Sequence, residues 1–120
     1  MKLYIKTYSP EKQRAIEELC GSFKAGVEKI SEKDLTRTVL DIITGGNRQS
    51  AGGLTIPPLY SLPEIIVFSD TNEEELKRFL DEYRLRGIEK IKLKAMVTPF
   101  NLSWTLFELV EHLKEEAGIR

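Results

Sequence analysis

Two stretches of this chain recur in the same order, and this repetition constrains the fold more than any other feature. The pentapeptide Gly-Val-Glu-Lys-Ile at residues 26–30 returns as Gly-Ile-Glu-Lys-Ile at residues 87–91. Residues 34–43 return at residues 101–110 with the residue class kept at nearly every place. Each half therefore has the pattern of one strand-helix-strand-helix unit, and we predict a duplicated unit packed on itself.

The length of the chain favours a single domain. Its 120 residues are enough to bury a core without disulfides or a metal. We predict pseudo-repeats over residues 1–44 and 64–116, joined by a connector rich in glycine and proline over residues 45–63. Long loops in compact domains are usually functional or disordered, but duplication offers a third explanation, the former junction between the copies, which we favour.

The composition excludes several classes of protein. The two signs of charge nearly cancel, leaving a net charge of -1, so the chain lacks the basic surface that a nucleic acid requires. A single cysteine, Cys20, and a single histidine, His112, exclude an internal disulfide and a zinc site. No apolar run is long enough to span a bilayer. We therefore expect a cytoplasmic protein without a metal, a cofactor, or a nucleic-acid or membrane partner.

Four predicted strands alternate with four predicted helices. Ser9 and Pro10 mark the start of the first helix, and Gly26 is its expected end. Residues 65–68 are continuously apolar, which a strand buried on both faces requires. Lysines at positions 90, 92 and 94 alternate with apolar residues, a pattern typical of an edge strand with one solvated face.

The predicted fold is α/β, with a four-stranded, mostly parallel sheet of order 2-1-3-4 and two helices on each face. This order follows if the first strands of the two units lie side by side and a pseudo-twofold axis runs along them. The strands at Leu3 and Ile66 are then central, and those at Val27 and Leu93 are edges. The alternative is an antiparallel or mixed sheet with all helices on one face.

The predicted topology places a crevice at the carboxyl ends of the central strands. Ser9 would there face Ser69 and Asp70, and together with the free amides of the following helices they would bind a small, anionic ligand. Helix capping alone also explains each of these residues and is the simpler interpretation.

A second candidate segment lies after the last strand. Thr98, Pro99, Phe100 and Asn101 form what the repeat marks as an insertion in the second copy, and Trp104 follows them. Proline before an aromatic residue is typical of a rigid turn, Asn101 or Ser103 could cap the next helix, and an indole is large enough to be needed for burial alone. Structural packing is therefore the simpler interpretation here too, with ligand binding as the alternative.

The same segment carries a family resemblance. The run at residues 93–106, preceded by residues 66–69 and an acidic helix start, resembles the bacterial domain of unknown function 3783, and residues 32–35 resemble the first half of that family. The resemblance implies a small cytoplasmic bacterial protein. It singles out Thr98, Pro99, Asn101 and Trp104 without assigning them a role.

The leading functional hypothesis is a non-catalytic binding or regulatory module for a small molecule or a protein partner. No catalytic residue stands out, because Cys20 and His112 lie on or beside apolar helix stripes without a partner at recognisable spacing. The alternative is a small enzyme that acts on a polar or anionic metabolite through Ser69, Asp70, Thr98 and Asn101. A third hypothesis is a homodimer through the edge strand at residues 90–97 or through Phe100 and Trp104.

Overall fold

The computed structural model describes residues 1–46 and 56–118, which form one sheet covered by helices. The strands are β1 (Lys2–Lys6), β2 (Gly26–Lys29), β3 (Ile65–Ser69) and β4 (Leu93–Met96). The helices are α1 (Pro10–Ser22), α2 (Val39–Thr44), α3 (Glu73–Leu85) and α4 (Leu106–Glu116), with a 3-10 turn, η1 (Glu32–Asp34), before α2. The elements thus follow the predicted alternation of strands and helices.

The strand order is β2-β1-β3-β4, which confirms the predicted order and the predicted central and edge strands. Strand β1 is parallel to β2, and β3 is parallel to β4. The central pair differs from the prediction, because β1 and β3 run antiparallel. All five residues of β3 are buried, as its continuous apolar sequence requires.

The predicted pseudo-twofold axis along the strands is therefore wrong. In the central pair Tyr4 lies opposite Val67, with Leu3 opposite Phe68 on one side and Ile5 opposite Ile66 on the other. A pseudo-twofold axis that passes through the Tyr4–Val67 pair, perpendicular to the sheet, relates the two strands instead. Rotation about this axis leaves each face of the sheet on its own side. Each helix then shares a face with its counterpart in the other half, which places the two 13-residue helices α1 and α3 in contact.

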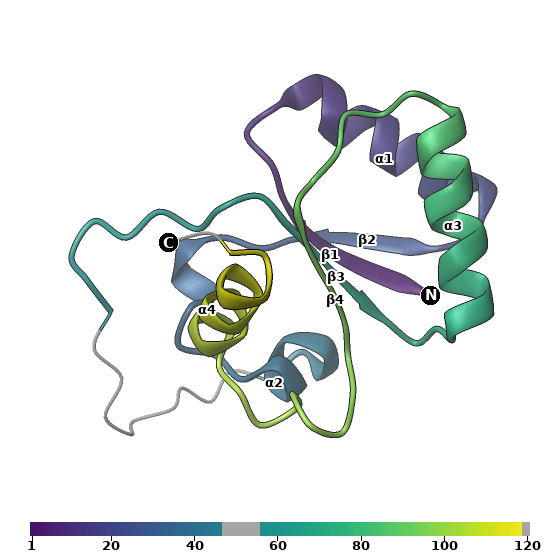
Figure 1. The fold of residues 1–120 in the computed structure, drawn as a ribbon. Coiled ribbons are helices and arrows are strands. Elements are labelled where there is room, and N and C mark those ends of the chain that lie inside the picture. The colour runs from purple at the N-terminus through teal and green to yellow at the C-terminus, as the bar shows by residue number, and fades with distance from the viewer. Residues whose placement is uncertain (47–55, 119–120) are drawn as a thin grey trace.

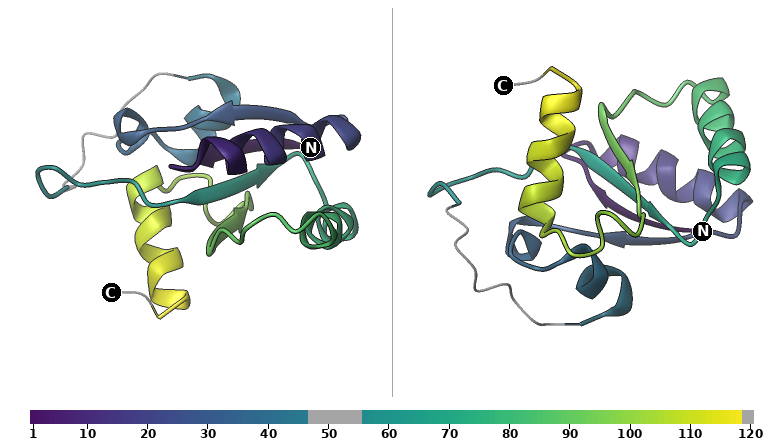
Figure 2. Two further views of the ribbon diagram at one scale, coloured as in Figure 1. Left: turned by 90° about the horizontal axis from the view of Figure 1, so that it is seen from above. Right: turned by 60° about the horizontal axis from the view of Figure 1, so that its bottom comes forward.

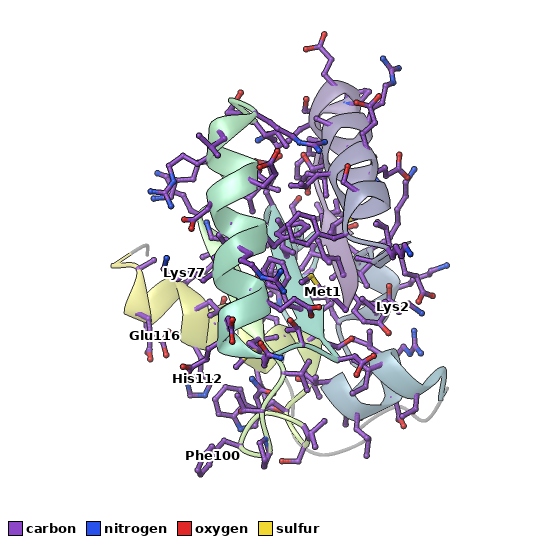
Figure 3. The ribbon with its side chains drawn as sticks, turned by 90° about the vertical axis from the view of Figure 1, so that its right-hand side faces the viewer. Met1, Lys2, Lys77, Phe100, His112 and Glu116 are labelled. Atoms are coloured by element: carbon purple, nitrogen blue, oxygen red, sulfur yellow. The ribbon has the colours of Figure 1, made fainter. Side chains whose placement is uncertain are left out.

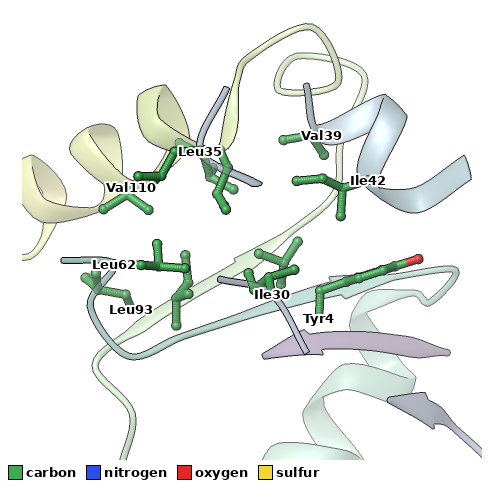
Figure 4. Close-up of a cluster of buried hydrophobic side chains, with 12 residues drawn as sticks. Tyr4, Ile30, Leu35, Val39, Ile42, Leu62, Leu93 and Val110 are labelled. Carbon is green, nitrogen blue, oxygen red and sulfur yellow. The ribbon is translucent and has the colours of Figure 1, made fainter. Parts of the chain in front are cut away.

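Helices cover both faces of the sheet, two on each, as predicted. Figures 1 and 2 show α1 and α3 on one face and α2 and α4 on the other. Under α1 and α3, the Phe79 ring meets Phe23 and Phe68 edge-on, at centroid distances of 5.3 and 5.6 Å. Under α2 and α4, Tyr4 and Val67 belong to a cluster with side chains from both helices, and Figure 4 shows Tyr4 beneath Ile42 of α2.

The two halves repeat their backbone contacts closely. Lys2 pairs with Gly26 at the start of β1 and β2, and Ile65 pairs with Leu93 at the start of β3 and β4. The residues before α2 and α4 meet at a β-bridge between Thr38 and Thr105. Matched hydrogen bonds flank this bridge: the amides of Val39 and Leu106 donate to the carbonyls of Trp104 and Arg37, at 2.8 and 2.9 Å, and those of Leu40 and Phe107 to Leu102 and Leu35.

The repeated pentapeptides, by contrast, are not equivalent in space. Residues 26–29 form β2, whereas residues 87–90 precede β4 and belong to no strand. The extra residues of the second half therefore lie before β4, so the predicted insertion at Thr98–Asn101 is wrong. Common descent of the two halves stays a hypothesis.

Helix ends follow the predicted chemistry more closely than the predicted positions. Ser9 caps α1, with its hydroxyl accepting from the Lys12 amide at 3.1 Å, as predicted. The residue that leaves α1 in the left-handed conformation is Lys24, with φ of 53°, and not Gly26. Gly87, with φ of 69°, takes that role after α3. Helix α4 is capped by Thr105, and not by Asn101 or Ser103.

The end of the predicted connector belongs to the core. Leu62 is fully buried among the side chains of α2, α4 and the sheet (Figure 4), and the Tyr60 ring meets Phe107 edge-on at 5.1 Å. These contacts anchor the chain beside α4 before it enters β3. Residues 47–55 of the connector lie outside the described part of the chain.

Candidate functional site

The antiparallel central pair separates the residues that were predicted to meet in one crevice. Lys2 lies opposite Ser69, so Ser69 and Asp70 are at the amino end of β1, whereas Ser9 follows its carboxyl end. The Ser69 hydroxyl donates to the carbonyl of Lys2 at 3.3 Å. The exposed Asp70 carboxylate lies 3.9 Å from the N-terminal ammonium group. The predicted crevice between Ser9 and Ser69 therefore does not form.

Thr98 and Asn101 build a turn after β4. The side-chain oxygen of Asn101 accepts from the Thr98 amide at 3.0 Å, and its amide nitrogen donates to the carbonyl of Met96 at 3.1 Å. After β2, Asp34 accepts from the Ser31 amide at 2.9 Å in the same way. Because the same turn recurs in the first half, these contacts give Asn101 a structural role in ordering the turn.

Trp104 and Phe100 also lie at this end of the molecule. The Trp104 ring stacks on the His112 ring at a centroid distance of 4.1 Å and an interplanar angle of 13°. Pro99 and Phe100 are exposed at the tip of the turn, and Figure 3 shows Phe100 projecting from the loop below His112. Trp104 is thus packed against His112, and Pro99 and Phe100 are open to solvent.

A cavity does form at the carboxyl end of β1, where one of the predicted residues lies. Because β1 and β2 are parallel, their carboxyl ends meet at the same edge of the sheet, and α1 begins beside them. The cavity has a volume of about 480 Å³ and is lined by the strand ends, the first turns of α1 and the residues that follow β2. This volume is typical of sites for small molecules.

The charged residues that line this cavity are mainly basic. Lys6, Arg14 and Lys29 reach it from β1, α1 and β2, and Glu17 is the one acid among the described lining residues. Lys6 lies 4.6 Å from the centroid of the Tyr8 ring and 3.7 Å from a carboxylate oxygen of Glu32. Three cations beside the amino end of a helix create a positive potential, which favours a negatively charged ligand.

Neutral hydrogen-bonding groups complete the lining. Ser9 and Ser31 contribute hydroxyls, and Gln13 contributes a side-chain amide from the second turn of α1. The amide nitrogen of Gln13 is buried and has no hydrogen-bond partner among the residues that the structure describes. A buried donor of this kind is costly unless it is paired, and an acceptor group of a bound molecule would satisfy it.

The corresponding positions in the second half are apolar. In the α3 helix Leu76 and Leu80 stand where α1 has Gln13 and Glu17, and both pack against the core under α1 and α3. Met96 in β4 stands where β2 has Lys29. Equivalent backbone positions are thus filled with apolar side chains in one half and line a polar cavity in the other.

Sequence reasoning identified Ser9 as a candidate site residue but missed the cations and other polar groups of this lining, among them Lys6, Gln13, Arg14, Lys29 and Ser31. A signal was available for some of them. Gln13 and Glu17 are polar at helix positions where the repeated half carries leucine, and Lys29 is charged where that half carries methionine. Comparing equivalent positions of the two halves would therefore have drawn attention to these residues.

A buried ion pair lies close to this cavity. The ammonium group of Lys12, a buried residue of α1, donates to both carboxylate oxygens of Glu64 at 2.9 and 3.1 Å and lies 3.5 Å from Glu89. Burial alone would raise the pKa of Glu64, but hydrogen bonds from Thr7 and Lys12 and the charge of Lys12 outweigh it and hold the pKa below its ordinary value. The pair ties the start of α1 to the start of β3.

The two residues that could act as nucleophile or base are placed in the predicted way. Cys20 is buried under α1, and this burial raises its pKa to about 11, which makes the thiol unreactive near neutral pH. His112 is an exposed residue of α4 that stacks on Trp104. No group of three or more His, Cys, Asp or Glu side chains among the described residues is placed to hold a metal ion.

One comparison with known protein families finds a match, and it lies in the second half of the chain. The family described as a domain of unknown function (DUF3783) matches residues 64–117, which comprise β3, α3, β4 and α4. No curated protein and no solved structure matches the chain. No helix within residues 1–46 and 56–118 is long and apolar enough to cross a membrane. The second of the two similar halves, residues 64–117, is therefore similar to the DUF3783 family.

Proposed function

We propose that this chain is a binding module for a small anionic metabolite, and that its site is the cavity at the carboxyl ends of β1 and β2. The observation that carries the proposal is the convergence of Lys6, Arg14 and Lys29 on a cavity of about 480 Å³. The unpaired amide nitrogen of Gln13 supports it, because a carboxylate or phosphate oxygen is a strong acceptor for such a donor.

Binding, and not turnover, is the role that the described contacts favour. The Ser9 hydroxyl already accepts from the Lys12 amide as the cap of α1, so it is held in place by the helix. The cations can neutralise an anion, and the hydroxyls and the amide can orient it. We place this module in the cytoplasm, because its single cysteine is buried and reduced and needs no oxidising compartment.

The proposal is tested by titrating the protein with inorganic phosphate, pyrophosphate, succinate and citrate while recording amide chemical shifts. We expect at least one of these anions to shift the amides of Ser9, Gln13 and Ser31 and to bind in a saturable way. Replacing Arg14 with glutamine should weaken that binding by about tenfold, since a hydrogen bond to a charged group contributes about 1.5 kcal/mol. Lys29→Gln should have a similar effect.

The matched control is Lys77→Gln, because Lys77 occupies in α3 the position that Arg14 occupies in α1 and does not line the cavity. Both variants lose one positive charge from an exposed helix position. Equal weakening by Arg14→Gln and Lys77→Gln would mean that the anion responds only to overall charge. If none of the four anions changed the chemical shifts of the amides at the cavity, the proposal would be contradicted.

A further inference from the structure

A second cavity opens on the other half of the sheet, between the end of α3 and the edge strand β4. Its volume is about 360 Å³, and it is lined by Leu80, Tyr83, Arg84, Ile88, Lys90 and Lys94. Half of these residues offer apolar or aromatic surface and the other half are cations. The lining is therefore amphipathic, in contrast to the more polar cavity beside β1 and β2.

Lys94 is the residue that makes this cavity unusual. It pairs with Ile66 in the sheet and points to the face that α1 and α3 cover, where its counterpart in β2, Val27, packs against the core. Its ammonium group donates to the carbonyl of Ile91 at 2.7 Å and is half-buried. The predicted row of solvated lysines is thus wrong at Lys94, which is turned inward, while Lys90 and Lys92 are exposed.

The positive charge around this cavity is largely uncompensated. Arg84 has an ion-pair partner in Asp81 at 3.0 Å, but Lys90 and Lys94 have none among the described residues. The nearby carboxylate of Glu89 is directed to Lys12, at 3.5 Å. Burial and the neighbouring charge of Lys90 lower the pKa of Lys94, because both disfavour the charged form of its ammonium group. An anion in the cavity would stabilise that charged form.

We propose that this second cavity binds a small amphipathic anion, with its apolar body against Leu80, Tyr83 and Ile88 and its negatively charged head against Lys90 and Lys94. The charge complementarity selects the sign of the head group, and the apolar wall selects a hydrocarbon or aromatic body. The ligand class therefore differs from that of the cavity beside β1 and β2, and the proposal does not depend on the function proposed for that cavity.

The test compares three probes that share one hydrocarbon chain and differ in charge: octanoate, octanol and octylammonium. Each is titrated into the full-length protein while the amide chemical shifts are recorded. Octanoate should shift the amides of Ile88, Lys90 and Lys94 in a saturable way, octanol should bind at least about tenfold more weakly, and octylammonium should leave these amides unchanged. Equal binding of octanoate and octanol would overturn the proposal.

Variants locate the head group. Lys94→Met and Lys90→Gln should each weaken octanoate binding by about tenfold, whereas Lys92→Met, a change at an exposed lysine outside the cavity, should not. Lys90 is exposed, so Lys90→Gln keeps the test valid if Lys94→Met unfolds the protein. If the original protein and Lys90→Gln bound octanoate with equal affinity, these cations would not hold the head group. The same would follow if Lys90→Gln and Lys92→Met lost equal amounts of affinity for octanoate.

Discussion

Single residues matter most in this protein where a charge is buried. The side chain of Lys12 is 5% exposed and that of Glu64 is 29% exposed, and their contact joins two elements that are far apart in the sequence. A buried pair adds little compared with apolar packing, but the loss of one partner leaves an uncompensated charge. The pair therefore makes the junction of α1 and β3 sensitive to single substitutions.

Glu64→Gln should lower the free energy of unfolding by about 3 kcal/mol, because the buried ammonium group of Lys12 loses its closest carboxylate. Urea denaturation at neutral pH measures this change. The control is Glu28→Gln, which breaks the exposed ion pair between Lys2 and Glu28 and should cost less than about 1 kcal/mol. Similar losses in the two variants would show that the burial of Lys12 has no energetic effect.

The same pair predicts how stability depends on pH. The pKa of Glu64 in the folded state lies below its ordinary value of 4.5, so its contribution to stability is complete above about pH 4.5. The contribution is lost as the pH falls through the folded-state pKa, because protonation then removes the negative charge. Between neutral and acidic pH, the free energy of unfolding should fall more steeply in the original protein than in Glu64→Gln. If the free energies of unfolding of the two proteins fell in parallel with pH, Glu64 would have the same pKa in the folded and unfolded states.

At the scale of the element, the clearest feature is the start of α2 and α4. Thr38 accepts from the Asp41 amide and Thr105 from the Glu108 amide, at 3.1 and 3.2 Å, and the two threonines form the bridge between the halves. The sequence pattern predicted the cap of α4 at Asn101 or Ser103, because serine, threonine and asparagine compete for this role within a few residues. In the structure the caps of α2 and α4 are Thr38 and Thr105, the two residues that form the bridge.

Thr38→Val and Thr105→Val should each destabilise the protein by about 1 kcal/mol, the usual effect of losing a helix cap with little change in volume. Thermal or urea unfolding of each variant measures the effect. Thr44→Val is the control, because the exposed Thr44 hydroxyl donates to the carbonyl of Leu40 within α2 and is not at the start of a helix. A loss in Thr44→Val as large as in Thr105→Val would contradict the capping role.

At the scale of the whole molecule, neither half has a core of its own. The cluster under α1 and α3 combines Leu3 and Ile16 with Ile66 and Phe79, and the other cluster likewise draws on both halves. The central strand β3 is buried along its whole length by contacts that include β1. The family match to residues 64–117 therefore covers half of an interlocked unit.

The fragment of residues 64–120 should accordingly show no cooperative unfolding by itself, although it contains the whole region that matches the family. Without β1 and α1, the buried residues of β3 and Phe79 face water, and the loss of this burial removes the main stabilising free energy. Circular dichroism during urea titration tests this expectation. Mixing with the fragment of residues 1–63 should restore a cooperative transition. A cooperative transition of the monomeric fragment would show that the half is a domain.

The sequence by itself determined the local features of this protein. Hydrophobic periods and the Ser9-Pro10 signal specify the alternation of strands and helices, and the continuous apolar run of β3 identifies a central strand. These features depend on neighbouring residues along the chain, so they are readable without coordinates. The strand order followed from the similarity of the two halves.

Only the tertiary structure decided the direction of the central pair and the place of the candidate site. Parallel and antiparallel pairings of β1 and β3 bury the same apolar residues, so the pattern of these strands does not distinguish them. The packing of α1 against α3 distinguishes the two pairings, because it requires both helices on one face of the sheet. In the antiparallel pair Ser69 lies at the opposite end of β1 from Ser9, and the cavity beside β1 and β2 is lined by residues of the first half, such as Arg14 and Lys29.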